Sequence, residues 1–351
     1  MPITKLSITE FLKLSKQHPV LDVRSPGEYR HAHIPNAYSL PLFTDEERKV
    51  VGTAYKQESR EKAIKIGLSY FGHKMVNMVE EVERLIADRN QTDNNNSKTV
   101  LVHCWRGGMR SAGVAWLLDL YGFTVYTLSG GYKAYRNWVL KQFEHTYNIH
   151  VLGGFTGSGK TRLLQQLASQ GETIIDLEKL AGHKGSAFGN LDKQPQPKQE
   201  MFENELAMAL TTAGSGPIWV EDESQRIGLV NIPGAFVRTL RESKLLFIDI
   251  PFEERLEYII SEYGNCDHES LEAGILRIKK RLGGLNTKNA IQFLKENNLK
   301  ECFRILLWYY DKLYNKALIE YTSPQRQINK IEAGSVDPVQ NAFLLLPQQI
   351  A

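Results

Sequence analysis

Residues 149–164 read IHVLGGFTGSGKTRLL, which is a short apolar strand, a glycine-rich turn and the start of an amphipathic helix. The turn matches G-x-x-x-x-G-K-T in full, and it stands between a strand and a helix, as that motif requires. Loop amides and the helix amino end cradle two linked phosphates, the lysine neutralises their charge, and the threonine hydroxyl ligates Mg²⁺. The predicted phosphate-binding residues are Gly154, Thr156, Gly157, Ser158, Gly159, Lys160 and Thr161.

The chain around this phosphate loop (residues 154–161) alternates strands with helical segments. Further strands are predicted near 173–176, 217–221 and 245–250, and from about Phe252 onward the pattern is mostly helical. Alternation of this kind predicts a parallel α/β sheet. The strand at 217–221 ends in acids, which is where a metal-binding or water-positioning carboxylate is expected. Asp222 is the first choice and Glu221 the second, with Mg²⁺ bound through Thr161.

Two basic segments of this half are candidates for contact with a substrate or RNA. A glycine-bearing loop follows the 174–176 strand, where α/β sheets place substrate-binding residues. A second basic cluster precedes the aromatic residues at 308–314, which offer stacking surfaces for RNA. An ordinary surface loop and an ordinary helix core are the alternatives. The predicted contacts are His183, Lys184 and Ser186 in the loop, and Arg277, Lys280 and Arg281 in the cluster.

A second motif lies upstream, where residues 99–111 read TVLVHCWRGGMRS. Cys104 stands between an apolar strand and a helix, so loop amides, the helix dipole and Arg110 all favour its thiolate. A thiolate placed in this way is a nucleophile, and the same amides can hold an anion. Cys266 and Cys302 have no such surroundings and are predicted to be structural. The anion-binding part of this cysteine loop is predicted to be Trp105, Arg106, Gly107, Gly108, Met109 and Ser111.

The length and composition agree with two globular domains. The 351 residues are 42% hydrophobic and 24% charged, and no apolar run approaches the ~20 residues of a membrane helix. We therefore expect no membrane partner, and three widely spaced cysteines without a secretory signal favour the cytoplasm. A net charge of +3 leaves an RNA partner open. The predicted domains are residues 1–147, with the cysteine loop, and 148–351, with the phosphate loop.

The first domain resembles the rhodanese family in LDVR at 21–24, EY at 28–29, HIPNA at 33–37, the Cys104 loop and LSGG at 128–131. Many rhodaneses have C-x-x-G-x-R-S, and this loop is one residue longer. It also satisfies H-C-x5-R-S, the pattern of tyrosine phosphatases, so a phosphatase remains an alternative. A longer loop makes a wider anion cradle, which favours a phosphate-bearing donor over a bare sulfur atom.

Together, the two motifs resemble one family over nearly the whole chain, the bacterial tRNA 2-selenouridine synthases. The resemblance also rests on HKGSAFG at 183–189 and VEDES at 220–224. It implies a rhodanese-like α/β domain followed by a P-loop NTPase-like parallel α/β domain with a mostly helical C-terminal part. It further implies a transferase that converts the 2-thiouridine at the tRNA wobble position to 2-selenouridine with selenophosphate, through an S-geranyl intermediate made from geranyl diphosphate.

The same resemblance assigns the residues their roles. Cys104 would attack the donor or carry selenium, Arg110 and the loop amides would hold selenophosphate, and no tightly bound cofactor is expected. The phosphate loop recognises linked phosphates and not a base, so geranyl diphosphate suits it as well as a nucleotide does. Two other functions stay open, namely a rhodanese-type sulfurtransferase coupled to an NTPase and a tRNA-binding regulator.

Overall fold

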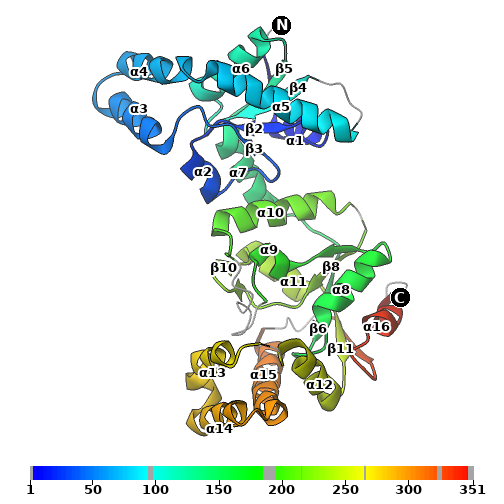
Figure 1. Cartoon of the computed structure of the whole chain (residues 1–351). Coiled ribbons are helices and arrows are strands. Elements are labelled where there is room, and N and C mark those ends of the chain that lie inside the picture. The colour runs from blue at the N-terminus through cyan, green and yellow to red at the C-terminus, as the bar shows by residue number, and fades with distance from the viewer. Residues whose placement is uncertain are drawn as a thin grey trace. The chain divides into compact units, whose positions relative to one another are not determined.

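The computed structural model describes residues 3–93, 98–184, 195–214, 216–264, 266–321 and 326–346. The chain divides into two compact units, Met1–Lys141 and Gln142–Ala351, which we describe separately (Figure 1). No helix in these ranges is both long enough and apolar enough to cross a bilayer.

The first unit is built on a five-stranded parallel sheet in the order β1-β5-β4-β2-β3. Its helices often begin at a capping box, as in Ser7 with Glu10 and Thr44 with Glu47, where each side chain satisfies a free amide of the other residue. Its elements are β1 Thr4–Leu6, α1 Ile8–Leu14, β2 Val20–Asp22, α2 Pro26–His31, β3 Tyr38–Ser39, α3 Asp45–Gln57, α4 Arg60–Gly72, α5 Met75–Asp93, β4 Thr99–His103, α6 Met109–Leu120, β5 Thr124–Leu128 and α7 Gly131–Gln142.

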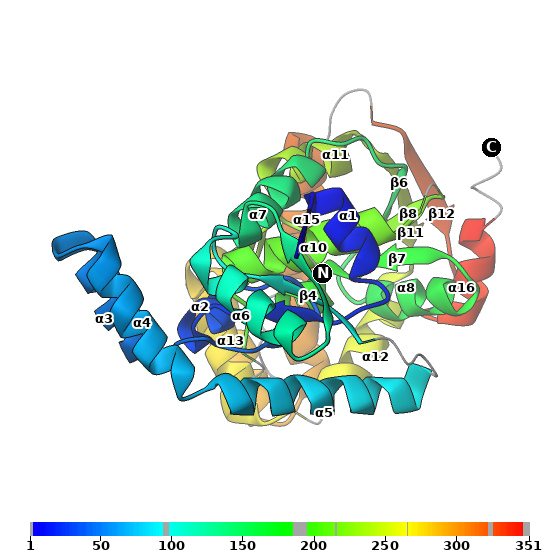
Figure 2. The ribbon, with the colours of Figure 1, turned by 90° about the horizontal axis from the view of Figure 1, so that it is seen from above.

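Helices α5 and α6 bury one face of this sheet. Val82 of α5 and Val114 of α6 belong to the same apolar cluster as Val100 and Val102 of β4. The intervening Leu101 and His103 point to the opposite face, because side chains alternate along a strand, and the ring of His103 lies near Phe11 and Tyr132 on that side. Helices α3 and α4 pair with each other and extend away from the sheet of their unit (Figure 2).

The second unit has its own five-stranded parallel sheet, in the order β12-β11-β6-β8-β7. The phosphate loop leaves the central strand β6, so it lies at the carboxyl edge between two buried neighbours. The elements are β6 Ile149–Gly154, α8 Lys160–Ser169, β7 Thr173–Ile175, α9 Leu177–Ala181, α10 Gln199–Thr212, β8 Ile218–Glu221, β9 Arg226–Ile227, β10 Val230–Asn231, α11 Gly234–Glu242, β11 Lys244–Asp249, α12 Phe252–Tyr263, α13 His268–Leu282, α14 Gly284–Lys295, α15 Leu299–Tyr321, β12 Ile328–Glu332 and α16 Pro338–Leu345.

The predicted fold class is confirmed, with two differences in detail. Helices α12–α15 do form a helical part with its own apolar core, which includes Leu256, Ile275 and Phe303. Beyond it, however, the chain returns to the sheet, where β12 pairs in parallel with β11 and α16 packs on α8. At the other end of the chain, β1, a strand that the sequence analysis did not predict, precedes α1 and pairs with β5.

Candidate active sites

The cysteine loop (residues 104–111) joins the buried strand β4 to helix α6. The Cys104 side chain is only 3% exposed, and its Sγ lies 3.2 Å from the Oγ of Ser111, the third residue of α6. Trp105 and Met109 are 37% and 52% exposed, so they form the rim of the loop. The thiol therefore sits at the base of a loop whose apolar rim is open to solvent.

The turn after β5 supports this loop from below. The amide of Tyr132 donates to the carbonyl of Cys104 at 2.8 Å, and the amide of Lys133 donates to that of Trp105 at 2.9 Å. Gly131 has a φ of +59°, and a Cβ there would lie 2.3 Å from the Cys104 carbonyl oxygen. Only glycine fits such a contact, which explains why the loop and the LSGG stretch belong together.

A buried ion pair lies under the same loop. Arg24 Nη2 binds the Asp22 carboxylate at 2.6 Å, and its guanidinium stacks over the Tyr132 ring at 3.7 Å. Burial tends to raise the pKa of Asp22, but His103 and Arg24 lower it overall, so Asp22 stays charged. Burial lowers the pKa of His103 although Asp22 opposes this, so the imidazole is neutral at pH 7. These groups fix the floor of the site and do not reach its opening.

Arg110 is held beside the loop by Glu28. Its Nη1 lies 2.8 Å from the Glu28 carboxylate, which also binds Arg48 Nε at 2.9 Å. Burial acts to raise the pKa of Glu28, but Arg110 and the other partners lower it overall. The single negative charge of Glu28 cannot neutralise both Arg110 and Arg48. The net charge beside the loop is therefore positive, which favours an anionic ligand.

The phosphate loop has the conformation that its glycines predict. Gly157 and Gly159 have φ values of +82° and +69°, and a Cβ on Gly157 would lie 2.9 Å from the Arg255 carbonyl oxygen of α12. Lys160 Nζ donates to the Gly154 carbonyl at 3.0 Å, and Ser158 Oγ to that of Phe155 at 2.7 Å. The lysine is thus folded over the loop, where it would meet a bound phosphate.

Arg255 braces this loop from α12. It donates through Nη1 to the Thr156 carbonyl at 2.9 Å and forms two hydrogen bonds of 2.9 and 2.8 Å with the Asp311 carboxylate of α15. Its guanidinium also lies 4.9 Å from the centre of the Phe155 ring. Because Arg255 is 3% exposed, these contacts tie the loop rigidly to the helical part of the unit.

Three carboxylates gather beside Lys160 and Thr161. Glu178 of α9, Glu221 at the end of β8 and Glu223 offer oxygens that lie within 4.8 Å of one another. Burial above all, together with mutual repulsion, raises the pKa of Glu178 to about 9 and that of Glu223 to about 7. Burial also raises the pKa of Glu221, against the effects of Lys160 and a hydrogen bond from Thr161.

The residues present fit a divalent cation at this cluster. Among the described residues, the buried Oε1 of Glu221 has no hydrogen-bond partner. Buried oxygens normally have a partner, so this atom is available to coordinate a cation. Carboxylates and a threonine hydroxyl are the hard oxygen donors that Mg²⁺ prefers. Glu221, Glu223, Glu178 and Thr161 are therefore the residues that would hold Mg²⁺.

The preference for Asp222 over its neighbours does not agree with the geometry. Its Oδ2 accepts a 2.6 Å hydrogen bond from Tyr314 Oη, and its Oδ1 lies 3.7 Å from Arg326 Nη2. Successive side chains at a strand end point to opposite faces, so Glu221 and Glu223 share the face with Lys160 while Asp222 does not. Asp222 instead fastens the strand end to α15, and the second choice, Glu221, takes the place beside the loop.

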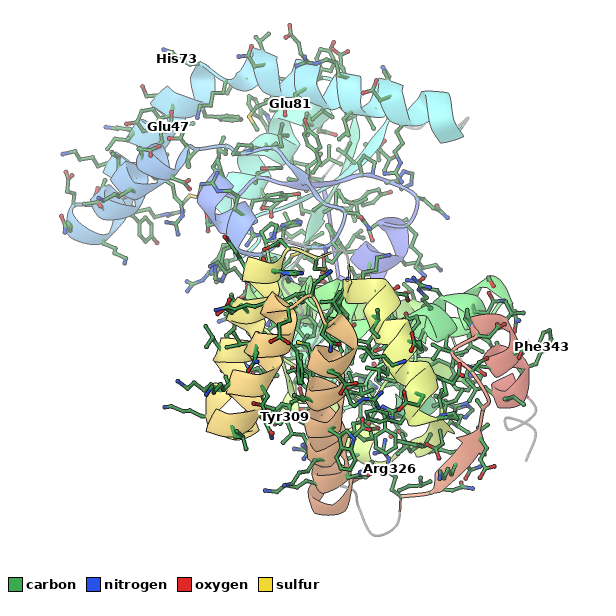
Figure 3. All side chains as sticks on the ribbon, turned by 60° about the horizontal axis from the view of Figure 1, so that its bottom comes forward. Glu47, His73, Glu81, Tyr309, Arg326 and Phe343 are labelled. Carbon is green, nitrogen blue, oxygen red and sulfur yellow. The ribbon has the colours of Figure 1, made fainter. Side chains whose placement is uncertain are left out.

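The basic residues predicted to contact substrate are only partly brought together. His183 follows α9, and burial first and then the charge of Arg277 on α13 lower its pKa, so these two lie close to each other. Lys184, Arg277, Lys280 and Arg281 are exposed. Arg281 hydrogen-bonds Tyr309 of α15. Figure 3 labels Tyr309 on that helix. Ser186 lies outside the described residues.

Sequence reasoning missed Glu178, Glu223 and Arg255. Glu178 carried a usable signal, because it is an acid two residues beyond the Asp176 strand end, at the same sheet edge as the phosphate loop. No local sequence pattern could have indicated Arg255, because it lies 99 positions from its partner Thr156. Tyr314, which we grouped with RNA-stacking aromatics, is half-buried and packs against Phe155 and Phe247.

The fold and sites define a class, a two-unit protein with a rhodanese-like cysteine loop and a P-loop. Comparison with known proteins assigns the chain to a family within this class. Residues 7–137 match the rhodanese-like domain family, and residues 147–341 match the family described as the tRNA 2-selenouridine synthase AAA domain. The chain therefore belongs to the tRNA 2-selenouridine synthase family.

Curated relatives support this assignment along most of the chain. The tRNA 2-selenouridine synthase of Hydrogenovibrio crunogenus is 34% identical, over 93% of this chain and 95% of that protein. The enzyme of the same name from Sulfurovum sp. is 36% identical, over 85% and 88%. That from Shewanella denitrificans is 34% identical, over 88% and 91%.

Proposed function

We propose that this protein converts the wobble 2-thiouridine of tRNA to 2-selenouridine in two reactions, one at each loop. The observation that supports this proposal is the pairing of two anion-binding loops with different reactive groups. The cysteine loop has a nucleophile, Cys104, and the phosphate loop has a cation, Lys160, beside three carboxylates. The first loop suits attack on a selenium donor, and the second suits departure of a diphosphate.

In the first reaction, the phosphate loop activates geranyl diphosphate. The thiouridine sulfur attacks C1 of the geranyl chain, the C1–O bond breaks with its electron pair on the diphosphate, and the N3 proton of the base leaves. Negative charge grows on the departing pyrophosphate, where Lys160 and the loop amides stabilise it. A Mg²⁺ held by Glu221, Glu223, Glu178 and Thr161 would add positive charge at the same place.

In the second reaction, the cysteine loop releases selenium from selenophosphate. The Cys104 thiolate attacks phosphorus, an S–P bond forms, and the P–Se bond breaks with its electrons on selenium. The hydroselenide attacks C2 of the S-geranyl base and displaces geranyl thiolate, which takes up a proton. Water then hydrolyses the S-phosphocysteine to phosphate and thiolate. Attack on phosphorus needs no oxidant or reductant, and the long loop, Arg110 and Ser111 suit a phosphate-bearing donor.

The exposed basic residues of the second unit would hold the tRNA backbone. Lys184, Arg277, Lys280 and Arg281 are exposed, and Arg281 lies beside Tyr309, so phosphate contacts are combined with an aromatic surface at that residue. Ser186 stays a prediction from the sequence. Loss of these charges should weaken tRNA binding in a salt-dependent manner and leave the chemistry at each loop intact.

Nucleoside mass spectrometry tests the proposal directly. Thiolated tRNA is incubated with the protein and with geranyl diphosphate, selenophosphate, or both. We expect S-geranyl-2-thiouridine with the first reagent and 2-selenouridine with both. Thiosulfate:cyanide turnover with nucleotide hydrolysis and no RNA product would instead support a sulfurtransferase. Hydrolysis of an aryl phosphate would support a phosphatase, and tRNA binding without product a regulator.

A further inference from the structure

Two guanidiniums share one carboxylate oxygen at the edge of the cysteine loop. Oε2 of Glu28 accepts a hydrogen bond from Arg110 Nη1 at 2.8 Å, and Arg48 Nε lies 2.9 Å from the same oxygen. Nitrogens that meet at one oxygen are themselves neighbours, so Arg48 of α3 lies beside a residue of the loop. Arg110 has a role in the proposed reaction, whereas Arg48 has none so far.

The first turn of α3 is fixed against α2, and this contact places Arg48. Asp45 Oδ1 accepts from the Gly27 amide at 2.9 Å, and a Cβ on Gly27 would lie 2.7 Å from the same oxygen, so the two segments are in close contact. Arg48 follows Asp45 by three residues, which puts both side chains on one face of the helix. The contact that holds α3 in place therefore also directs Arg48 to Glu28.

Both guanidiniums keep donors for a further acceptor. Among the described residues, Arg48 makes this one ion pair, through Nε, and its two Nη groups have no partner. Arg110 donates to Glu28 through Nη1 and, at 3.5 Å, through Nη2, which leaves its Nε without a partner in the same part of the chain. The Arg48 side chain is 50% exposed, so it can turn toward a ligand without leaving a hole in the core.

The other acids of this region have cations of their own. Asp45 pairs with Arg30 at 3.2 Å, and Glu47, labelled in Figure 3, pairs with Lys74. Burial acts to raise the pKa of Glu28, but the hydrogen bond from Arg110 and its other partners lower it overall, so Glu28 is ionised at neutral pH. A doubly charged anion can therefore satisfy the two guanidiniums better than this single carboxylate does.

We propose that Arg48 is a second donor-binding guanidinium of the cysteine loop, and that Glu28 holds it with Arg110 until a tetrahedral anion replaces the carboxylate. This inference rests on the proposed function and assigns the residues that receive and release the phosphate group. The dianion meets both guanidiniums with charge-assisted hydrogen bonds. Once S-phosphocysteine has been hydrolysed, Glu28 competes with the product phosphate for the same cations and speeds its departure.

Protection of Cys104 from alkylation measures binding at the cysteine loop, apart from the phosphate loop and from any turnover. The full-length protein is treated with iodoacetamide over a range of inorganic phosphate at constant ionic strength, and the Cys104 peptide is quantified by mass spectrometry. Arg48→Ala should raise the phosphate concentration for half-protection by about fivefold or more, since one of two cations is lost. Arg48→Lys should recover part of this loss. Lys49→Ala, the neighbouring exposed charge, is the control and should have no effect.

Glu28→Gln separates this role from that of a simple brace. Glutamine keeps the capping box with Ser25 and still accepts from Arg110, but the negative charge is gone. We expect half-protection at a phosphate concentration at least about threefold lower. In selenium transfer, KM for selenophosphate and kcat should both fall, because phosphate leaves slowly. If Arg48→Ala and Glu28→Gln weaken protection alike, the three residues are only a brace and the proposal is overturned.

The two proposals can fail separately. If both variants shift half-protection as expected but the natural protein transfers no selenium from selenophosphate, the proposed function is wrong while the two guanidiniums still bind phosphate. If selenium is transferred and Arg48→Ala changes neither half-protection nor KM, only the role of Arg48 is rejected. Failure of phosphate to protect Cys104 in the natural protein rejects that role as well.

Discussion

The two loops of this protein have the same position in their folds but are supported in different ways. Each leaves the carboxyl end of a buried parallel strand and runs into a helix, with glycines of positive φ in the turn. The cysteine loop is supported by backbone from the turn after β5, through the amides of Tyr132 and Lys133. The phosphate loop is supported by side chains from the helical part, chiefly Arg255 with Asp311.

This difference corresponds to what each loop must do. Backbone support leaves the cysteine loop rigid, so that a single buried thiol can be aimed at an anion. The phosphate loop depends on side chains of α12 and α15, since Arg255 of α12 binds the Thr156 carbonyl and Asp311 of α15. We therefore expect the chemistry of the first unit to tolerate changes in the second, and the phosphate loop to respond to changes in its helical part.

Replacement of the nucleophile is the strongest test of this division. Cys104→Ser should lower selenouridine formation by at least about 1000-fold, because the nucleophile is lost, and should leave geranylation nearly unchanged. Nucleoside mass spectrometry after incubation with each reagent measures both products. Cys266→Ser is the matched thiol control. If both products vanish while circular dichroism shows a folded chain, the two-loop assignment is wrong.

Replacement of the phosphate-loop lysine should have the next largest effect. Lys160→Ala should slow geranylation by about 100-fold or more, since charge on the leaving pyrophosphate loses its main cation. The same variant given tRNA that is already S-geranylated should still incorporate selenium. Lys279→Ala, an exposed change on α13, serves as the control. Unchanged geranyl transfer in Lys160→Ala would show that the phosphate loop has another ligand.

Removal of the Arg255 side chain, which supports the phosphate loop, should lower the free energy of unfolding. Arg255→Ala leaves the Asp311 carboxylate and the Thr156 carbonyl without their partner, and breaking a buried pair of this kind costs about 3 kcal/mol or more. Urea unfolding of the full chain measures this cost. Arg304→Ala removes an exposed ion pair with Glu253 from the same helical part and should change the midpoint little. Equal midpoints for the two variants would contradict the bracing role of Arg255.

The carboxylate cluster should make the stability of the second unit depend on pH, whereas the cysteine loop should not have this effect. Folding raises the pKa of Glu178 from its ordinary value of 4.5 to about 9, so the folded chain binds a proton that the unfolded chain releases. Stability should therefore fall as pH rises from about 4.5 to 9, and Mg²⁺ should reduce the fall by offsetting the repulsion.

Thermal unfolding between pH 6 and 9 measures this slope. Glu178→Gln should flatten it, because the amide does not ionise, whereas Glu242→Gln at an exposed position should leave it as it is. A slope that is the same in Glu178→Gln and in the natural protein would place the titrating groups elsewhere.

The sequence by itself determined both loops and the fold class. Each loop is a local motif, in which a strand, a glycine turn and a helix follow one another within about 15 residues, and local order is what a sequence displays. The family resemblance rested on the same stretches, and the comparisons confirmed it. The positions of Cys104 after a strand end and of Lys160 and Thr161 at a helix start could thus be predicted without a structure.

Only the tertiary structure decided which distant groups complete each site. Arg255 reaches Thr156 across 99 positions and Tyr314 reaches Asp222 across 92, and no local pattern encodes such distances. The alternation of side chains at the end of β8 turned Glu221 and Glu223, not Asp222, toward Lys160. The return of β12 to the sheet likewise brings Val336 against Gly159 of the phosphate loop. Motifs place the reactive atoms, and packing between distant segments decides what surrounds them.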